Sequence, residues 1–256
     1  MRGARFFLLS TALLVTMAPV SQARTLSDIR ASGTLDVATS ADFEPFNYMK
    51  GSVPAGFEVD LATLLAQRLG LKVHWVIRPF DGLLTDLGER PDDIDLVIAS
   101  HAITSTRLKT VDFGTPHYCT GGVLLTRAGG PTTSKALAGK NLGAESGSTY
   151  FGFLQKLPLR KTVQVYPSSD AAIQAVATGQ VDAIATDRFA ALGAVKTYSK
   201  ANLIIGETLW KEQIAVAYQK GNSELRQAVN GALSQLIRDG SYAALSKRYF
   251  GTNIGC

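Results

Sequence analysis

The chain has 256 residues, of which 26 are Lys or Arg and 21 are Asp or Glu, giving a formal net charge of +5. This mild excess of positive charge is not clustered, so it favours an ordinary solvated surface and argues against a nucleic-acid partner. The three histidines lack the spacing of metal ligands and the chain has no phosphate-binding loop, so we expect no metal and no cofactor.

The first 23 residues are typical of a secretory signal peptide. Arg2 and Arg5 precede an apolar run, and small residues lead up to Ala23, after which we expect cleavage. The run is too short and too interrupted to span a bilayer comfortably. Cleavage removes two arginines and no acid, leaving a net charge of +3. We therefore expect a soluble protein exported to the periplasm.

The stretch GFEVDLATLLAQRLG, residues 56–70, predicts an amphipathic helix. Leucines recur at every fourth position, at Leu61, Leu65 and Leu69, as one buried helical face requires. Glu58 and Asp60 suit the positive end of the helix dipole. Gly70 follows the last leucine and can end the helix in the left-handed conformation.

Two later segments repeat one order of elements: a strand, a proline, a helix and a buried strand. They cover residues 71–100 and 161–187, with Ser168 or Ser169 as the expected helix cap in the second. The first follows a strand at 34–40, and the second follows a strand, a turn and a helix over 140–154. Continuous apolar strands indicate parallel sheets, so we predict two similar α/β lobes.

Two further strands, 119–127 and 212–220, connect the lobes if the final helices, 221–251, return to the first lobe. This organisation predicts a two-strand hinge with a cleft between the lobes. The predicted boundaries are 24–118 with 217–256 for lobe one, 119–216 for lobe two, and 117–122 and 212–218 for the hinge. The two cysteines, Cys119 and Cys256, can form a disulfide in an exported protein or remain as two thiols.

Ligands of open parallel sheets bind beyond the carboxyl ends of the strands. This rule selects Ser40–Phe43, Phe80, Ala99–Ala102, Glu145–Thr149 and Thr186–Asp187. Arg107 follows soon after the strand that ends near Ala99.

The chemistry of these residues fits a zwitterion. Arg107 has a planar guanidinium that suits a carboxylate, and a helix starting near Ser148 offers N–H groups to an anion. Asp187 either caps the following helix or binds an ammonium group. Phe43 and Phe80 either pack in the core or form aromatic walls around a side chain. Together they predict an amino-acid site.

The stretch 56–70 also resembles the signature of the family 3 extracellular solute-binding proteins, the polar amino-acid receptors of ABC importers. The resemblance extends over essentially the whole mature chain and includes FEPFNY, RLKTVDF, GQVDA, NSELRQAVNGAL and the final KRYFG. It implies a Venus-flytrap fold, with an amino acid or derivative bound between the lobes and a permease as partner. In this family residues 56 and 57 form the turn into a scaffold helix. We expect a monomer.

The resemblance also implies roles for individual residues. Arg107 would hold the α-carboxylate, helped by Ser148 and Thr149, and Asp187 would bind the α-ammonium. The remaining expected contacts come from Phe43 and Phe80 beside the ligand side chain and from Ala99 and Ser100 through backbone and hydroxyl groups.

The chain departs from the family pattern at a few of these positions. Ala102 replaces a Ser or Thr, and Ser40 replaces an Asp that meets polar or cationic ligands in relatives. Glu145 stands where relatives carry Lys or an apolar residue. It either faces the ligand, favouring a cationic or amide side chain, or points to solvent or pairs with a local base. His101 is unusual for the family and is expected to line the cleft.

Two other functions use the same fold. A cyclohexadienyl dehydratase-like enzyme would need an acid or base in the cleft, for which Glu145 and His101 are candidates. A ligand sensor would need a membrane partner. The amino-acid head-group set favours a binding protein over an enzyme, and the sequence does not identify the amino acid.

Overall fold

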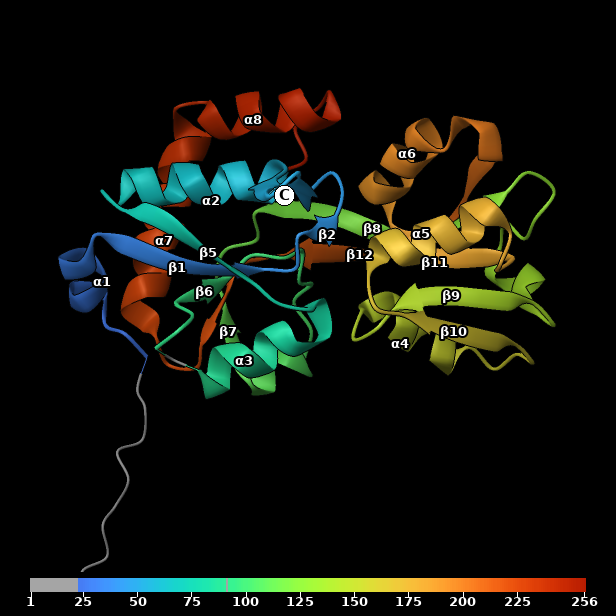
Figure 1. Cartoon of the computed structure of the whole chain (residues 1–256), viewed down its shortest axis with the longest axis horizontal. Helices are drawn as coiled ribbons and strands as arrows, with labels where there is room; N and C mark the ends of the chain where they lie inside the picture. The colour runs from blue at the N-terminus through green and yellow to red at the C-terminus, as the bar shows by residue number, and fades with distance from the viewer. Residues whose placement is uncertain (1–22, 91) are drawn as a thin grey trace, which may run out of the picture.

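The computed structural model describes residues 23–90 and 92–256. The predicted signal peptide therefore lies, except for Ala23, outside the described residues. The fold contains two five-stranded sheets, which lie side by side along the long axis of the molecule (Figure 1). We call the half around the sheet β5-β1-β6-β13-β7 lobe one and the half around the sheet β10-β9-β11-β8-β12 lobe two. The predicted two-lobed α/β fold is confirmed.

Lobe one has a mixed sheet in which β1 lies between two parallel neighbours, β5 and β6. Its strands are β1 (Thr34–Thr39), β5 (Lys72–Ile77), β6 (Leu96–Val97), β7 (Val111–Phe113) and β13 (Ala217–Gln219). Its helices are α1 (Leu26–Ser32), α2 (Phe57–Arg68), α3 (Leu83–Glu89), α7 (Ser223–Arg238) and α8 (Ser241–Phe250). A small antiparallel sheet of β2 (Asp42–Phe43), β3 (Asn47–Lys50) and β4 (Val53–Ala55) is an addition that the sequence pattern did not predict.

The helix predicted within residues 56–70 is α2, and Gly56 explains how the chain enters it. Gly56 has φ of 122°, and a Cβ there would lie 2.3 Å from the Phe46 carbonyl oxygen. Only glycine fits this close approach. The N–H groups of Phe57 and Glu58 donate to the carbonyls of Pro45 and Phe46, so the helix start is fixed against the β2–β3 loop.

Lobe two follows the second predicted unit closely. Its strands are β8 (Tyr118–Arg127), β9 (Asn141–Glu145), β10 (Thr162–Tyr166), β11 (Ala183–Asp187) and β12 (Leu203–Ile214), and its helices are α4 (Thr149–Lys156), α5 (Ser169–Thr178) and α6 (Arg188–Thr197). Strand β9 pairs in parallel with β10 and β11. Ser168 accepts from the Ala171 N–H, which confirms the expected cap of α5. The remaining short helices are η1 (Phe80–Gly82), η2 (Arg107–Lys109), η3 (Ser134–Leu137) and η4 (Ser199–Ala201).

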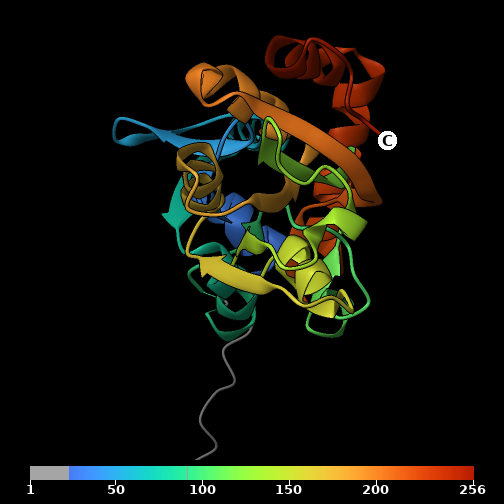
Figure 2. The same ribbon diagram turned by 90° about the vertical axis from the view of Figure 1, so that its right-hand side faces the viewer.

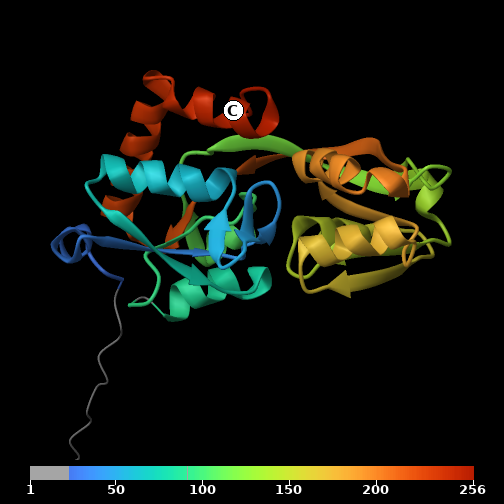
Figure 3. The same ribbon diagram turned by 45° about the horizontal axis from the view of Figure 1, so that its top comes forward.

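The chain passes between the two sheets at two places, before β8 and after β12. Figure 3 shows β8 and β12 reaching from lobe two toward lobe one. The two strands pair antiparallel as far as Tyr118 and Ile214. The predicted single strand at 212–220 is instead divided: its first part ends β12, and β13 then pairs with β6 and β7 in the other sheet. The division arises because the two parts belong to different sheets.

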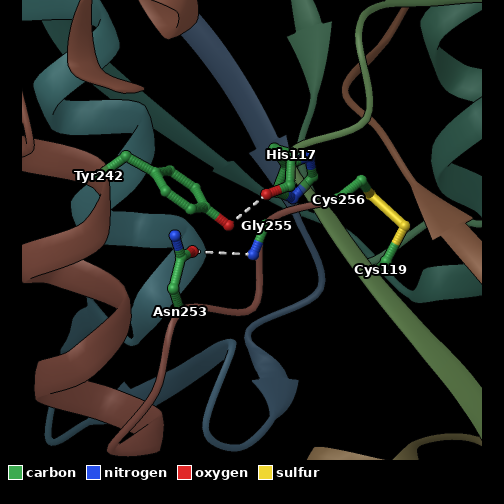
Figure 4. Close-up of a disulfide and its surroundings, with 6 residues drawn as sticks. All are labelled: His117, Cys119, Tyr242, Asn253, Gly255 and Cys256. Carbon is green, nitrogen blue, oxygen red and sulfur yellow. Dashed lines mark hydrogen bonds between the residues drawn. A yellow bond between two sulfur atoms is a disulfide. The ribbon is translucent and has the colours of Figure 1, made fainter. Parts of the chain in front are cut away.

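The final helices return to lobe one, as expected, where α7 and α8 pack on α2. In the view from lobe two, the red C-terminal helices lie at the top of the molecule (Figure 2). The chain then runs back to β8, where the Cys119 N–H donates to the Ile254 carbonyl at 3.0 Å. Cys119 and Cys256 form a disulfide with Cα atoms 5.0 Å apart, and Tyr242 donates to the His117 carbonyl beside it (Figure 4).

Within residues 23–90 and 92–256, no helix combines the length and apolar character needed to cross a membrane.

Candidate functional site

Polar residues of lobe one form one hydrogen-bond network around the buried Glu58. Its carboxylate accepts from the Asn47 amide at 2.7 Å and from the N–H and hydroxyl of Ser100, both at 2.9 Å. It also lies 2.9 Å from Nε2 of His117. The Ser40 hydroxyl donates to Oδ1 of Asn47 at 3.0 Å. The hydroxyls of the predicted residues Ser40 and Ser100 are therefore already bonded, and the network holds Ser100 at φ of 57°.

Phe80, His101 and Arg107 form a stack on lobe one. The rings of Phe80 and His101 are 4.3 Å apart and nearly parallel, and the Arg107 guanidinium carbon lies 5.7 Å from the Phe80 ring centre. Burial, assisted by the positive charge of Arg107, holds the pKa of His101 well below its usual range. His101 is therefore a neutral, buried ring in this stack, and its expected place in the cleft stays a prediction.

Arg107 reaches from lobe one to lobe two. Its Nη1 donates to the Ala102 carbonyl at 2.9 Å, and its Nη2 donates to the Gly147 carbonyl at 3.2 Å. Burial lowers the pKa of Arg107, while Glu212, Tyr150 and Glu145 act in the opposite direction. A guanidinium has five N–H donors, so these two bonds leave donors for a further acceptor.

The turn before α4 is closed by its own side chains. The Ser148 hydroxyl donates to the Glu145 carbonyl at 2.7 Å and accepts from the Phe151 N–H at 3.1 Å. The Thr149 hydroxyl donates to Glu212 at 2.6 Å. Ser148 is thus a helix cap, and the groups left for an anion are the other N–H groups of the first turn of α4.

Glu212 is a site residue that the sequence analysis missed. It is 7% exposed and accepts from both Thr149 and the Tyr150 hydroxyl. A cavity of ≈ 570 Å³ lies between the lobes at this point, lined by Ala102, Ile103, Thr104, Cys119, Thr120, Thr149, Trp210, Lys211, Glu212 and Gln213. Its volume is in the range of small-molecule sites.

Asp187 lies at the carboxyl end of β11 and caps the following helix, one of the two alternatives expected of it; ammonium binding stays a prediction. Its Oδ1 caps α6, accepting from the N–H groups of Phe189 at 2.6 Å and Ala190 at 3.1 Å. Its Oδ2 is buried and forms no hydrogen bond among the described residues, and the Thr120 hydroxyl, also unpaired, lies close enough to lower the pKa of the carboxyl against the larger effect of burial. Burial is the main cause that raises the pKa of Asp187 to about 7, with Glu212 adding to it. One oxygen remains for a donor such as an ammonium group.

Glu145 ends β9 and is 6% exposed, so it does not point to solvent. Its Oε1 has no hydrogen-bond partner among the described residues. Burial, followed by the charge of Asp42, raises the pKa of Glu145 well above its usual range. Burial and the absence of an ion pair to Glu145 among the described residues argue against the solvent-facing and base-paired alternatives, and contact with a ligand stays a prediction.

The remaining predicted residues are buried in lobe one. Phe43 stacks on Phe46 at 5.3 Å and belongs to the main core cluster. Ala99 and Ala102 are 2% and 4% exposed, and the Ala102 carbonyl accepts from Arg107. Among residues 23–90 and 92–256, no group of three or more His, Cys, Asp or Glu side chains is placed to hold a metal ion.

Comparisons with known proteins show similarity to one protein family over most of the chain. Residues 35–252 match the model of the bacterial extracellular solute-binding proteins, family 3. The chain is 33% identical to the L-cystine-binding protein TcyJ of Escherichia coli K12, over 90% of this chain and 87% of that protein. It is 30% identical to the lysine/arginine/ornithine-binding periplasmic protein of the same strain, over 86% and 89% of the two chains.

Solved structures of amino-acid-binding proteins are also similar to this chain. An ancestral arginine-binding protein bound to arginine is 36% identical, with a TM-score of 0.81, covering 86% of this chain and 99% of that one. The ancestral amino-acid-binding protein AncCDT-1, a precursor of cyclohexadienyl dehydratase, is 30% identical with a TM-score of 0.80, covering 88% and 99%.

Proposed function

Because the chain belongs to the bacterial extracellular solute-binding proteins, family 3, we propose that it captures a polar amino acid between its lobes in the periplasm. It then delivers this amino acid to the permease of an ABC importer. The observation that carries the proposal is the Arg107 guanidinium. It stands on lobe one and donates to the Gly147 carbonyl of lobe two, so it lies where both lobes can contact one ligand.

In this proposal the two ends of the amino-acid head group bind opposite charges. The α-carboxylate accepts from the free donors of Arg107 and from N–H groups at the start of α4. The α-ammonium donates to Oδ2 of Asp187, which has no other partner among the described residues. The ring of Phe80, already packed against Arg107, forms one wall, and Phe43 forms the edge of the other.

Capture then depends on contacts with both lobes. A ligand bound to Arg107 on one lobe and Asp187 on the other stabilises the closed arrangement, which a permease can distinguish from the open one. We place the hinge at 117–122 and 212–218, where the chain passes between the sheets, with the lobe boundaries at 118 and 217. The protein acts as a monomer in this scheme.

The first experiment measures binding directly. The purified protein, stripped of bound solute, is titrated by calorimetry with the common L-amino acids, ornithine, citrulline and cystine. We expect one class to bind, and Arg107→Ala to weaken that binding by about 2–5 kcal/mol, the cost of removing one partner from a buried charge pair.

Arg160→Ala is the matched control, because Arg160 is an exposed arginine of lobe two outside the site. It should leave the dissociation constant unchanged. Equal affinities for the wild type and Arg107→Ala, with both variants folded by their melting temperature, would contradict the proposed carboxylate site.

One observation supports a second candidate function, that of a dehydratase-like enzyme. The buried Glu145 carboxyl, with its raised pKa, is the kind of group that can act as a general acid. Turnover of prephenate or arogenate by the wild type, lost in Glu145→Gln, would favour this enzyme over the receptor.

A further inference from the structure

Glu145 is a buried carboxyl group with an oxygen that has no partner among the described residues. Strand β9 places it opposite Tyr166 of β10, at the edge of the sheet from which α4 and α5 begin. The N–H of Ser169, the first residue of α5, lies close enough to lower the pKa of Glu145 against the larger effect of burial, and the helix dipole favours negative charge there. Its Oε1 is buried and unpaired among the described residues. A buried carboxylate in this state is unfavourable unless a cation or a proton joins it.

Three further carboxyl groups face Glu145 from three other elements. Asp42 on β2 and Asp81 on η1 belong to lobe one, and Asp170 on α5 belongs to lobe two; each is close enough to raise the pKa of Glu145. Asp42 also has a buried unpaired oxygen, Oδ1, and the Glu44 N–H of lobe one lies close enough to Asp170 of lobe two to lower its pKa against the larger effect of burial.

Asp42 and Asp81 of lobe one lie near Glu145 and Asp170 of lobe two only because the lobes are in contact. The Ser146 hydroxyl of lobe two donates to Asp81 of lobe one at 2.9 Å, and a Cβ on Gly147 would lie 2.8 Å from the Cβ of Asp81. Like charges that meet in this way oppose closure. A positive group enclosed between them would reverse that effect.

No protein cation neutralises this set within residues 23–90 and 92–256. None of Asp42, Asp81, Glu145 and Asp170 takes part in an ion pair there. Arg107 is the nearby cation, but its side-chain bonds go to the Ala102 and Gly147 carbonyls. The carboxyl groups also do not converge as a metal site. An organic cation on a side chain of the ligand fits both facts.

We propose that Glu145, together with Asp42 and Asp170, binds a second positive group on the ligand, so that the captured amino acid carries a cation beyond its α-ammonium. The inference rests on the proposed function. Arg107 donates to Gly147, two residues from Glu145, and the Ser148 N–H returns to the Glu145 carbonyl at 3.4 Å. The proposed site for the α-carboxylate, at Arg107, and the proposed site for the second cation, at Glu145, therefore lie on the two sides of one tight turn.

Pairs of ligands that differ in one charge test this directly. Arginine and citrulline have nearly the same shape, but only arginine has a charged end; lysine and ornithine supply other second cations. Calorimetry on the wild type should show arginine or another dication bound at least about tenfold more tightly than citrulline, as expected for a charged hydrogen bond.

Glu145→Gln keeps the shape and removes the charge. It should weaken binding of the preferred dication by about tenfold to a hundredfold and leave citrulline binding unchanged or stronger. Glu89→Gln, at an exposed position on α3, is the matched control and should change neither value. If Glu145→Gln does not fold, Asp42→Asn gives the same comparison, and the wild-type ligand pairs need no variant.

The outcomes separate the inference from the function on which it rests. Citrulline binding as tightly as arginine, or equal losses for both ligands in Glu145→Gln, would overturn the second cation site while leaving an amino-acid receptor. Absence of binding by every amino acid would overturn both.

Discussion

At the scale of single residues, Asp187 combines a structural role with a proposed ligand role, and its two oxygens separate them. Oδ1 caps α6, whereas Oδ2 is buried without a partner among the described residues. The pKa of this carboxyl is raised from 3.8 to about 7, so the folded protein holds a proton that the unfolded chain releases above about pH 4. Stability contributed by Asp187 is therefore present at low pH and is lost as the pH rises to about 7.

Asp187→Asn should separate the two roles. Asparagine keeps the cap and removes the buried charge, so at pH 8 the ligand-free variant should be more stable than the wild type by about 1–3 kcal/mol. The gain should disappear near pH 4, and amino-acid binding should be lost at both values. Thermal melts at the two pH values and one titration measure this.

Asp187→Ala is the matched control, because it removes the cap as well as the charge and should lose about 0.5–2 kcal/mol relative to Asp187→Asn. A lower melting temperature for Asp187→Asn than for the wild type at pH 8 would mean that the carboxylate is favourably paired in solution.

Some residues of the site could be found from sequence and others could not. Glu145 and Asp187 end β9 and β11, and the rule for strand ends was enough to select them. Arg107 was selected because its guanidinium suits a carboxylate. Glu58 was interpreted only as a charge suited to the helix start, although it lies three and seven positions before the buried Leu61 and Leu65 and is itself buried. That spacing was the available signal for a buried acid.

At the scale of elements, the disulfide joins the last residue to β8, close to where the chain leaves lobe one. It closes a loop across a sequence separation of 137 residues, and the pairing could not be known from the sequence because α8 must first bring Cys256 back to Cys119. The tail also bonds to β8 through the Ile254 carbonyl and buries the Ile254 side chain in the lobe-one core.

Replacing both cysteines with serine should destabilise the protein by about 2–4 kcal/mol, since the unfolded chain gains freedom when the bond is absent. The melting temperature should fall by roughly 4–16 °C for a domain pair of this size. Each single variant should lose as much as the double variant, because either one breaks the same bond. Additive losses from the two single variants would indicate that the thiols contribute separately through packing.

Other elements show where sequence patterns reach their limit. The helices α2 and α5 were predicted because a buried face repeats over several turns. Strands β2, β3 and β4 are two to four residues long, too short to establish an alternation. Strand β12 alternates buried and exposed residues near its end, with Glu212 and Ile214 both buried, and this alternation could have revealed Glu212.

At the scale of the whole molecule, the repeated strand–helix–strand order predicted two lobes, and the parallel pairing of β1 with β5 and of β9 with β10 confirms it. Which residues meet across the lobes could not be read from either unit alone. The contacts of Arg107 with Gly147 and of Asp81 with Ser146 depend on how two separately folded sheets are placed.

The acids that meet across the lobes should make closure depend on pH. Asp42, Asp81 and Glu44 on lobe one face Glu145 and Asp170 on lobe two, and burial, with Asp42 and Glu44 adding to it, raises the pKa of Asp170 to about 6 in this arrangement. A carboxyl whose pKa is raised by closure takes up a proton as the lobes close, so lowering the pH favours the closed form. We expect small-angle X-ray scattering of the ligand-free protein to give a larger radius of gyration at pH 8 than at pH 5.

A saturating amino acid with a second cationic group should give the smaller radius of gyration at both pH values, because its positive charge replaces the proton. Asp42→Asn combined with Asp170→Asn should remove most of the difference between the two pH values. A radius that is the same at pH 5 and pH 8 in the wild type would show that these carboxyl groups do not oppose closure.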